Sequence, residues 1–324
     1  MKPRKRHCGL VVNYACNAAC RHCLYACSPK RNSGYMSEDS CERICLLLQE
    51  RGIDTIHIGG GEPFLDFKSL LGVIRTVRRA GLNIEYLETN GFWASDEKRA
   101  VYYLGELKQA GAETLLISID PFHVEYVPVE SPLRLADICK KVEFGYFLWQ
   151  EQFQEKLSHL ESDRVYSRYE LEKTLSQDYI LETTEAYGLG TQTGRAINIA
   201  QEYFPKIPVA DLIKNSHACH NLLNTTFMHI DLYEKFIIPG CTGITIPLED
   251  AVRGVPRGRY PVYEALVSDG VAGLLKFIDG LGLTFEEEYV SYCSLCFNIR
   301  HWLSKTGTYA ELDSEHYEAV LSYY

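Results

Sequence analysis

Apolar and polar residues alternate along the first half of the chain in segments that predict strands and helices in turn. Short apolar runs typical of buried parallel strands are separated by longer segments of helical period, several of which end at a glycine. The predicted strands are Gly9–Tyr14, Thr55–Ile58, Asn83–Glu88, Thr114–Ile119, Val142–Trp149 and Arg195–Ala200, and the predicted helices are Ser37–Glu50, Lys68–Ala80, Asp96–Ala110 and Leu133–Lys141. Six such units are too few to close an eight-stranded barrel, so we expect an α/β fold with an open, partial (β/α)6 barrel.

The pattern changes near residue 206, which divides the chain into two predicted domains, residues 1–205 and 206–324. The charged segment 150–178 is predicted to be a mainly helical bridge. Beyond residue 206, two short alternating runs, Thr225–Ile230 and Lys235–Pro239, predict a hairpin. Further helices are predicted at Tyr263–Val267, Val271–Leu281 and Ala310–Tyr324. The second domain is therefore expected to be a smaller α+β domain.

Composition and charge exclude several classes of function. The chain has 324 residues, 46% of them hydrophobic, and a formal net charge of −10, which argues against a general nucleic-acid-binding surface. No stretch approaches the roughly 20 apolar residues of a membrane span, and no long apolar segment follows the basic N-terminus as it would in a signal peptide. We therefore expect a cytoplasmic protein without a nucleic-acid or membrane partner.

Twelve cysteines in a chain without an export signal favour metal binding or burial over disulfide bonds. Three of them, Cys16, Cys20 and Cys23, follow the first predicted strand in the spacing C-x-x-x-C-x-x-C. Three thiolates on one loop can hold three irons of a cubane cluster and leave the fourth iron open for a ligand. On spacing alone, a structural zinc site is the alternative.

Polar residues also follow the next three predicted strands. The second strand ends in Gly59-Gly60-Gly61-Glu62-Pro63, the third in Glu88-Thr89-Asn90-Gly91 and the fourth in Ser118-Ile119-Asp120. In barrels, this end of the strands carries the ligand-binding loops, and consecutive glycines let a ligand approach the backbone. An ordinary turn is the alternative for the glycine segment by itself. Four polar strand ends in register, with the cysteine loop included, favour a ligand site.

The ordered combination of these motifs resembles the radical S-adenosylmethionine (radical SAM) superfamily over the first 200 residues. The resemblance implies that Cys16, Cys20 and Cys23 ligate a [4Fe–4S] cluster whose open iron binds S-adenosylmethionine. The cofactor is then cleaved to a 5′-deoxyadenosyl radical that abstracts hydrogen from a substrate, with flavodoxin or ferredoxin as the electron donor. The implied cofactor-binding residues are Gly60, Gly61, Glu62, Thr89, Asn90, Ser118, Asp120 and, within Gly194-Arg195-Ala196, Arg195. For Arg195, a surface arginine is the alternative.

A second set of cysteines, Cys219, Cys241, Cys293 and Cys296, makes a complete shell for a [4Fe–4S] cluster or for zinc. Its order resembles the short auxiliary-cluster (twitch/SPASM-like) domain found downstream of many radical SAM enzymes, which favours iron–sulfur. Two histidines that flank Cys219 are alternative ligands or solvated loop residues, namely His217 and His220. The other five cysteines are expected to be buried, namely Cys8, Cys27, Cys41, Cys45 and Cys139.

Radical SAM enzymes with one extra cluster commonly modify ribosomally made peptides, and local motifs here resemble peptidyl epimerases. In those enzymes a cysteine next to an auxiliary ligand returns a hydrogen to the substrate. Here Thr242 follows Cys241, and its O–H bond is too strong to donate. Cys27 is the alternative donor, and thioether formation, carbon–carbon coupling or oxidation are alternative outcomes. His123, just past the fourth strand, is a candidate for proton handling, with an ordinary loop histidine as the alternative.

We therefore expect an enzyme that modifies a peptide. The sequence predicts no separate N-terminal recognition domain, so a leader-peptide-binding partner, if needed, would be another protein. A radical SAM enzyme acting on a small molecule is the second hypothesis, and a non-catalytic zinc protein is the third.

Overall fold

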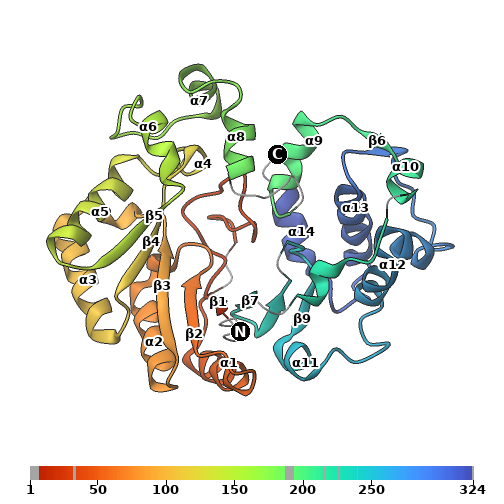
Figure 1. Ribbon diagram of the computed structural model, residues 1–324, viewed down its shortest axis with the longest axis horizontal. Helices are drawn as coiled ribbons and strands as arrows, with labels where there is room; N and C mark the ends of the chain where they lie inside the picture. Colours follow the sequence, from red (N-terminus) through yellow and green to blue (C-terminus); the bar gives the residue numbers. More distant parts are fainter. Residues whose placement is uncertain are drawn as a thin grey trace, which may run out of the picture. The chain divides into compact units, whose positions relative to one another are not determined.

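The computed structural model describes residues 7–31, 34–186, 193–214, 216–224, 227–238 and 240–322. The chain divides into two compact units (Figure 1). The first unit consists of residues 1–20, 27–188 and 230–234, and the second of residues 21–26, 189–229 and 235–324.

The first unit is built on a parallel sheet in the order β5-β4-β3-β2-β1. Its strands are β1 (His7–Val11), β2 (Thr55–Gly59), β3 (Asn83–Thr89), β4 (Thr114–Ser118) and β5 (Gly145–Trp149). The connecting helices are α1 (Glu38–Glu50), α2 (Phe67–Arg79), α3 (Glu97–Ala110) and α5 (Glu130–Lys141), and Figure 1 shows them on one side of the sheet. Each of these elements overlaps the segment predicted for it, and the α/β class is confirmed.

Local signals explain why the helices begin and end where they do. The Ser37 hydroxyl accepts a hydrogen bond from the Ser40 amide at the start of α1, as expected of an N-cap. At the C-terminal end of α3, Gly111 adopts a left-handed conformation with φ of 97° that ends the helix. Apolar residues of α2 such as Val73 and Val77 are buried, which packs this helix onto the sheet.

The predicted sixth strand, Arg195–Ala200, is wrong, because this segment begins the helix α9 (Ala196–Tyr203). Ala196 through Ala200 are all buried, so the run has no alternation of buried and exposed residues that would separate a strand from a helix. Periodicity cannot distinguish a short, fully buried helix from a strand. Among the described residues, the parallel sheet of the first unit therefore has five strands rather than the six of a (β/α)6 arrangement.

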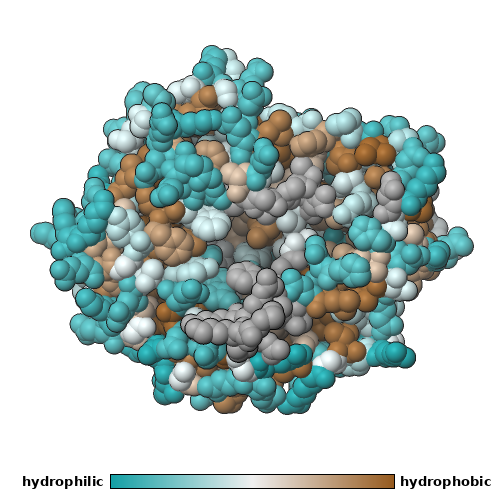
Figure 2. Space-filling model, in the orientation of Figure 1, coloured by the Kyte–Doolittle hydropathy of each residue, from teal (hydrophilic) through white to brown (hydrophobic). Residues whose placement is uncertain are grey.

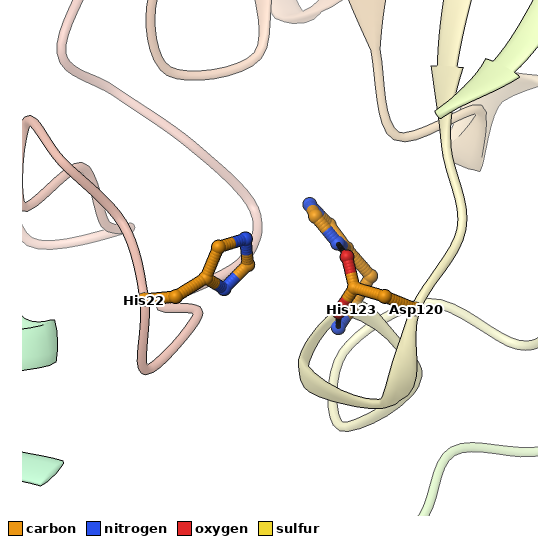
Figure 3. A group of neighbouring side chains, drawn as sticks. All are labelled: His22, Asp120 and His123. Atoms are coloured by element: carbon orange, nitrogen blue, oxygen red, sulfur yellow. Dashed lines mark hydrogen bonds and ion pairs between the residues drawn. The ribbon is translucent and has the colours of Figure 1, made fainter. Parts of the chain in front are cut away.

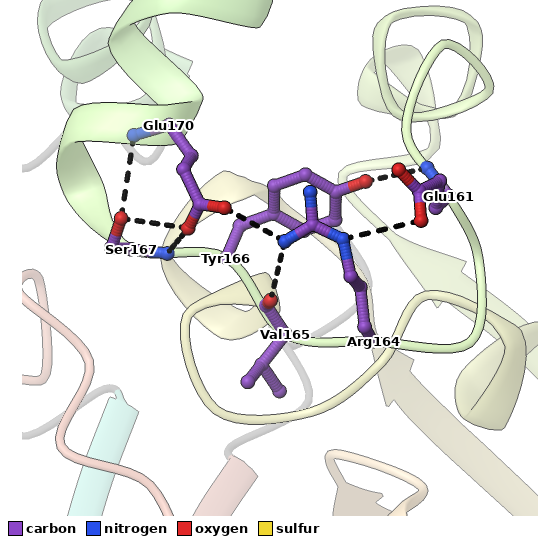
Figure 4. A network of polar contacts seen from close by, with 6 residues as sticks. All are labelled: Glu161, Arg164, Val165, Tyr166, Ser167 and Glu170. Carbon is purple, nitrogen blue, oxygen red and sulfur yellow. Dashed lines mark hydrogen bonds and ion pairs between the residues drawn. The ribbon is translucent and has the colours of Figure 1, made fainter.

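The charged segment after β5 contains the short helices η3 (Glu151–Phe153), α6 (Gln154–Leu157) and α7 (Arg168–Thr174), followed by α8 (Tyr179–Ala186). Figure 4 shows the polar network at the start of α7. Ser167 and Glu170 form a capping box, and the Glu170 carboxylate accepts a hydrogen bond from Arg164 Nη1 at 2.8 Å. Hydrogen bonds from Ser167 and Arg164 lower the pKa of Glu170 to about 2. These contacts hold the segment in place locally.

The second unit combines short strands and helices. The hairpin predicted around residues 231–234 is present as β7 (Phe227–Asp231) and β8 (Lys235–Ile237), although its residues 230–234 are counted in the first unit, and β8 pairs antiparallel with β9 (Thr245–Pro247). A separate antiparallel pair joins β6 (Ile207–Pro208) to β10 (Glu288–Tyr289). The helices are α10 (Val209–Lys214), η4 (His220–Leu223), α11 (Leu248–Arg253), α12 (Pro261–Phe277), α13 (Tyr292–Ser304) and α14 (Ser314–Leu321).

The two helices expected between residues 263 and 281 are present as the two parts of α12, which are separated by a kink where Asp269 and Gly270 have non-helical backbone angles. Gly270 has a φ of +59°, and a Cβ at this position would lie 2.1 Å from the His217 carbonyl oxygen. The Ser216 hydroxyl donates to the Asp269 carbonyl at 3.0 Å and accepts from the Ala272 amide at 3.1 Å, which satisfies backbone groups that the kink leaves open.

Among the helices that the structure describes, none is both long enough and apolar enough to cross a membrane. On the face drawn in Figure 2, hydrophilic residues cover much of the surface, with smaller apolar areas between them.

Candidate cysteine-centred active site

Cys16, Cys20 and Cys23 lie on one loop between β1 and α1, and backbone pairing closes the loop at its base. Ala15 and Ser28 form a β-bridge, and the Cys16 amide donates to the Ser28 carbonyl at 3.2 Å. The Cys20 side chain is buried, whereas Cys16 and Cys23 are half-buried. The three cysteines of the motif therefore lie within one closed loop.

Gly60 and Gly61, which follow β2, lie too close to the backbone before the cysteine loop for any side chain to fit. The Gly61 amide donates to the backbone oxygen of Asn13 at 2.9 Å and to its side-chain oxygen at 3.1 Å. A Cβ on Gly61 would lie 2.0 Å from the Ala15 carbonyl oxygen, and one on Gly60 would lie 2.6 Å from the Asn13 carbonyl oxygen. The two glycines thus permit close contact between two backbone segments, and their contact with a ligand stays a prediction.

Glu62 joins the ends of β2 and β3 to each other. Its carboxylate is 1% exposed and accepts hydrogen bonds from the Thr89 hydroxyl at 2.9 Å, the Asn90 amide at 2.7 Å and the Phe64 amide at 3.1 Å. The Asn90 side chain in turn donates to Asn17 Oδ1, on the cysteine loop, at 2.8 Å. Three predicted site residues, Glu62, Thr89 and Asn90, are therefore brought together beside that loop.

Burial of this carboxyl group raises the pKa of Glu62 to about 7, although the hydrogen bonds from Asn90, Phe64 and Thr89 act in the opposite direction. We expect Glu62→Gln to remove a pH dependence of stability. Because the folded chain binds the Glu62 proton more tightly than the unfolded chain, this contribution to stability is complete below pH 4.5 and is lost as the pH rises through 7. The shift corresponds to about 3 kcal/mol.

Urea unfolding of the wild type and Glu62→Gln at pH 5, 6 and 7 measures this effect. The wild-type free energy of unfolding, relative to the variant, is expected to fall across that range. Glu113→Gln is the matched control, because Glu113 is exposed and its replacement should give a constant difference. A constant difference for Glu62→Gln would contradict the prediction.

Asp120 and His123 lie at α4 (Pro121–Val124), directly after β4 (Figure 3). The buried Asp120 carboxylate accepts hydrogen bonds from the Phe122 amide at 2.7 Å and contacts His123 Nδ1. Burial alone lowers the pKa of His123, but the Asp120 carboxylate and the Cys20 sulfur outweigh it, so the pKa is raised well above its ordinary value. Asp120 thus caps the helix and holds the His123 ring beside Cys20.

Further residues that sequence reasoning missed join the strand ends to the cysteine loop. Tyr126 donates its hydroxyl proton to the Ala19 carbonyl at 3.1 Å, and Asn13 lies two residues after the end of β1. Trp93 Nε1 donates to the Thr89 hydroxyl at 3.0 Å. The predicted strand Gly9–Tyr14 included Asn13, whereas β1 ends at Val11, so a polar residue near the end of the apolar run was the signal that could have identified it. Ser118 ends β4 and is half-buried, and its role as a ligand contact stays a prediction.

Arg195 is buried, with 1% of its surface exposed, so the alternative of a surface arginine is excluded. Its amide donates to the Cys23 carbonyl at 3.1 Å. Gly194 has a φ of +55°, and a Cβ there would lie 2.4 Å from the same carbonyl oxygen. On its other side, the Gly194 amide donates to the Thr242 hydroxyl at 3.1 Å. Within the second unit, the Gly194–Arg195 pair therefore connects the Cys23 backbone to the residue after Cys241.

The four cysteines of the second set line one cavity of about 230 Å³ in the second unit. Cys219 precedes η4, Cys241 lies between β8 and β9, and Cys293 and Cys296 lie at the start of α13. Each comes from a different element except the last pair, which is spaced so that both side chains lie near the helix start. The structure thus brings together residues that are up to 77 positions apart (296 − 219).

The chemistry of the cavity suits a bound cation. Burial raises the pKa of Cys219, Cys293 and Cys296, and repulsion from the neighbouring cysteines adds to the effect. A metal that binds the thiolates would displace these protons.

The remaining residues that the sequence suggested for the site are Cys27, His217 and His220. Cys27 is buried on the cysteine loop with 2% of its surface exposed, and its role as a hydrogen donor stays a prediction. His217 and His220 are exposed and also line the cavity of the second unit.

Residues 10–144 match the model of the Radical SAM superfamily. The chain is 28% identical over 126 residues to the peptide biosynthesis protein YydG of Bacillus subtilis (strain 168), an alignment covering 39% of each protein. It is 35% identical over 124 residues to a GTP 3′,8-cyclase of Peptoclostridium acidaminophilum, covering 36% of each. Both alignments span well under half of each relative.

Among solved structures, native anSMEcpe with bound AdoMet and Cp18Cys peptide has a TM-score of 0.41 and 14% sequence identity, and the match covers 90% of this chain and 95% of that chain.

Proposed function

This chain belongs to the radical SAM superfamily through its residues 10–144, and we propose that it is an enzyme that cleaves S-adenosylmethionine and abstracts hydrogen from a peptide. In such a site, a [4Fe–4S] cluster with S-adenosylmethionine supplies a 5′-deoxyadenosyl radical. The observation that carries the proposal is the closed cysteine loop, which the residues after β2, β3 and β4 contact through Gly61, Asn90 and Tyr126.

In the proposed site, Cys16, Cys20 and Cys23 hold the cluster. Glu62 holds the loops after β2 and β3 together. Gly60, Gly61, Thr89 and Asn90 then form one binding surface for the cofactor beside the cluster. Arg195 is buried and its backbone amide bonds to the Cys23 carbonyl, and its guanidinium is proposed to bind the carboxylate of the cofactor. His123 beside Cys20 is the candidate for proton handling.

A second [4Fe–4S] cluster is proposed in the cavity lined by Cys219, Cys241, Cys293 and Cys296. Support comes from the cavity itself, whose lining brings all four cysteines together. A cluster there would take up or supply an electron after hydrogen abstraction. Thr242 hydrogen-bonds to Gly194 and Thr193, which suits a structural role and leaves Cys27 as the candidate hydrogen donor.

A peptide substrate is favoured by the similarity to the peptide biosynthesis protein and by the local likeness to peptidyl epimerases. A small-molecule substrate is the second candidate, and the similarity to a GTP 3′,8-cyclase favours it. Flavodoxin or ferredoxin is the proposed electron donor, and a separate leader-peptide-binding protein is a proposed partner.

Anaerobic purification followed by metal analysis and reduction with dithionite in the presence of S-adenosylmethionine tests the proposal. The expected result is a brown protein with about eight irons per chain, four from each cluster, that forms 5′-deoxyadenosine. A colourless protein that contains zinc and forms none would contradict it.

Mass spectrometry of peptides encoded beside the gene, treated in deuterated water, separates the reaction outcomes. Epimerisation with an exchangeable donor replaces one carbon-bound hydrogen by deuterium, whereas a thioether, a carbon–carbon bond or an oxidation removes two hydrogen atoms. If no peptide changes and a small molecule increases 5′-deoxyadenosine formation, the second candidate replaces the first.

A further inference from the structure

Arg300 places a buried positive charge against the cysteine cavity of the second unit. It lies on α13 four residues after Cys296, has 5% of its surface exposed and lines the same cavity as the four cysteines. Its Nη1 donates to the Tyr317 hydroxyl at 2.8 Å and approaches the Thr242 carbonyl at 3.4 Å. Its Nε is buried and has no hydrogen-bond partner among the described residues.

A buried guanidinium needs a compensating negative charge, because burying an isolated ion is costly. Within the described part of the chain, no carboxylate forms an ion pair with Arg300. The groups that interact with its charge are Cys241, Tyr317 and Cys296, and the guanidinium also hydrogen-bonds to Cys296. The cysteine sulfur atoms of the cavity are therefore the groups that Arg300 faces, and they would be anionic thiolates once a cluster is bound.

Tyr317 fixes the position of this charge. Its hydroxyl accepts from Arg300 and donates to the Gly243 carbonyl at 3.0 Å, two residues after Cys241. The guanidinium is thus held between the first turn of α13 and the loop that carries Cys241. A fixed charge in a buried site cannot be replaced by mobile solvent, so its effect on a neighbouring anion is large.

We propose that Arg300 is a positioning residue that stabilises the reduced form of the second cluster and so raises its reduction potential. The inference rests on the proposed second cluster. A cluster held by four thiolates is anionic, and taking up one electron adds a further negative charge. A fixed cation favours the reduced form more than the oxidised form, so charge and hydrogen bonding at the thiolates set the potential.

Redox titration monitored by electron paramagnetic resonance tests this inference. Cys20→Ala serves as the background, so that the second cluster is observed alone in the full chain. Arg300→Met is expected to lower the equilibrium constant for one-electron reduction at least tenfold, which is a shift of about 59 mV. Arg300→Lys, which keeps the charge, is expected to retain most of the wild-type potential. Arg259→Met is the matched control, since Arg259 is exposed and does not line the cavity.

Equal potentials for Arg300→Met and its Cys20→Ala parent would contradict the inference alone, while zinc in the parent would contradict the proposed second cluster as well. If Arg300→Met does not retain iron, Arg300→Lys and Arg300→Gln decide the matter. Iron retained by the lysine variant and lost by the glutamine variant supports the role of charge. Loss of iron from both variants would assign Arg300 a role in packing and overturn the inference.

Discussion

Replacing Cys20 by alanine is expected to abolish 5′-deoxyadenosine formation and to remove about four of the irons, because a cluster on this loop has only three protein ligands. Cys20 is the most sensitive of the three positions, since it is buried and faces His123. The loop closure between Ala15 and Ser28 involves backbone atoms alone, so the fold should survive the change. Iron and sulfide analysis, together with a 5′-deoxyadenosine assay, measures the outcome.

Two further alanine variants control this experiment. Cys296→Ala is expected to remove the other irons, about four, while 5′-deoxyadenosine still forms. Cys139→Ala, in the buried face of α5, should keep both clusters and activity, with only a small loss of stability. Wild-type iron content and activity in Cys20→Ala would show that the loop is not the site of the cluster.

Gly61→Ala is expected to destabilise the chain by about 3 kcal/mol or more, as a steric clash with backbone atoms does. The added Cβ would lie 2.0 Å from the Ala15 carbonyl oxygen and 2.6 Å from its carbonyl carbon. Relief requires the Gly61 amide to move away from Asn13, which breaks the contact between β2 and the cysteine loop. The measurements are urea unfolding and iron content, and both should decrease.

Alanine substitutions at two other glycines serve as controls that separate the effect of this clash from the effects of backbone conformation and backbone entropy. Gly105 lies within α3 with open space around it, so Gly105→Ala should stabilise the chain by about 0.5–1 kcal/mol. Gly52 has a φ of +68° and open space, so Gly52→Ala should cost about 1–2 kcal/mol from conformation alone. If Gly61→Ala behaves like Gly105→Ala, the proposed close contact between the two backbone segments is wrong.

The strands and helices of the first unit could be predicted because their signals are local. Ser37 caps α1, and Gly111 ends α3, at the positions that sequence rules assign to them. The segment Arg195–Ala200 could not be predicted correctly, because its complete burial depends on packing by distant parts of the chain, as the Asn198 hydrogen bond to Val320 illustrates.

For the candidate site, the sequence by itself determined the residue types, their order and the edge of the sheet at which they gather. The spacing of Cys16, Cys20 and Cys23, and the polar residues after successive strands, depend only on neighbours along the chain. Only the tertiary structure decided that Glu62 accepts three hydrogen bonds from within the protein and that Arg300 faces the second set of cysteines. Such contacts depend on how the packed sheet and helices bring distant residues together, and no periodic pattern encodes that arrangement.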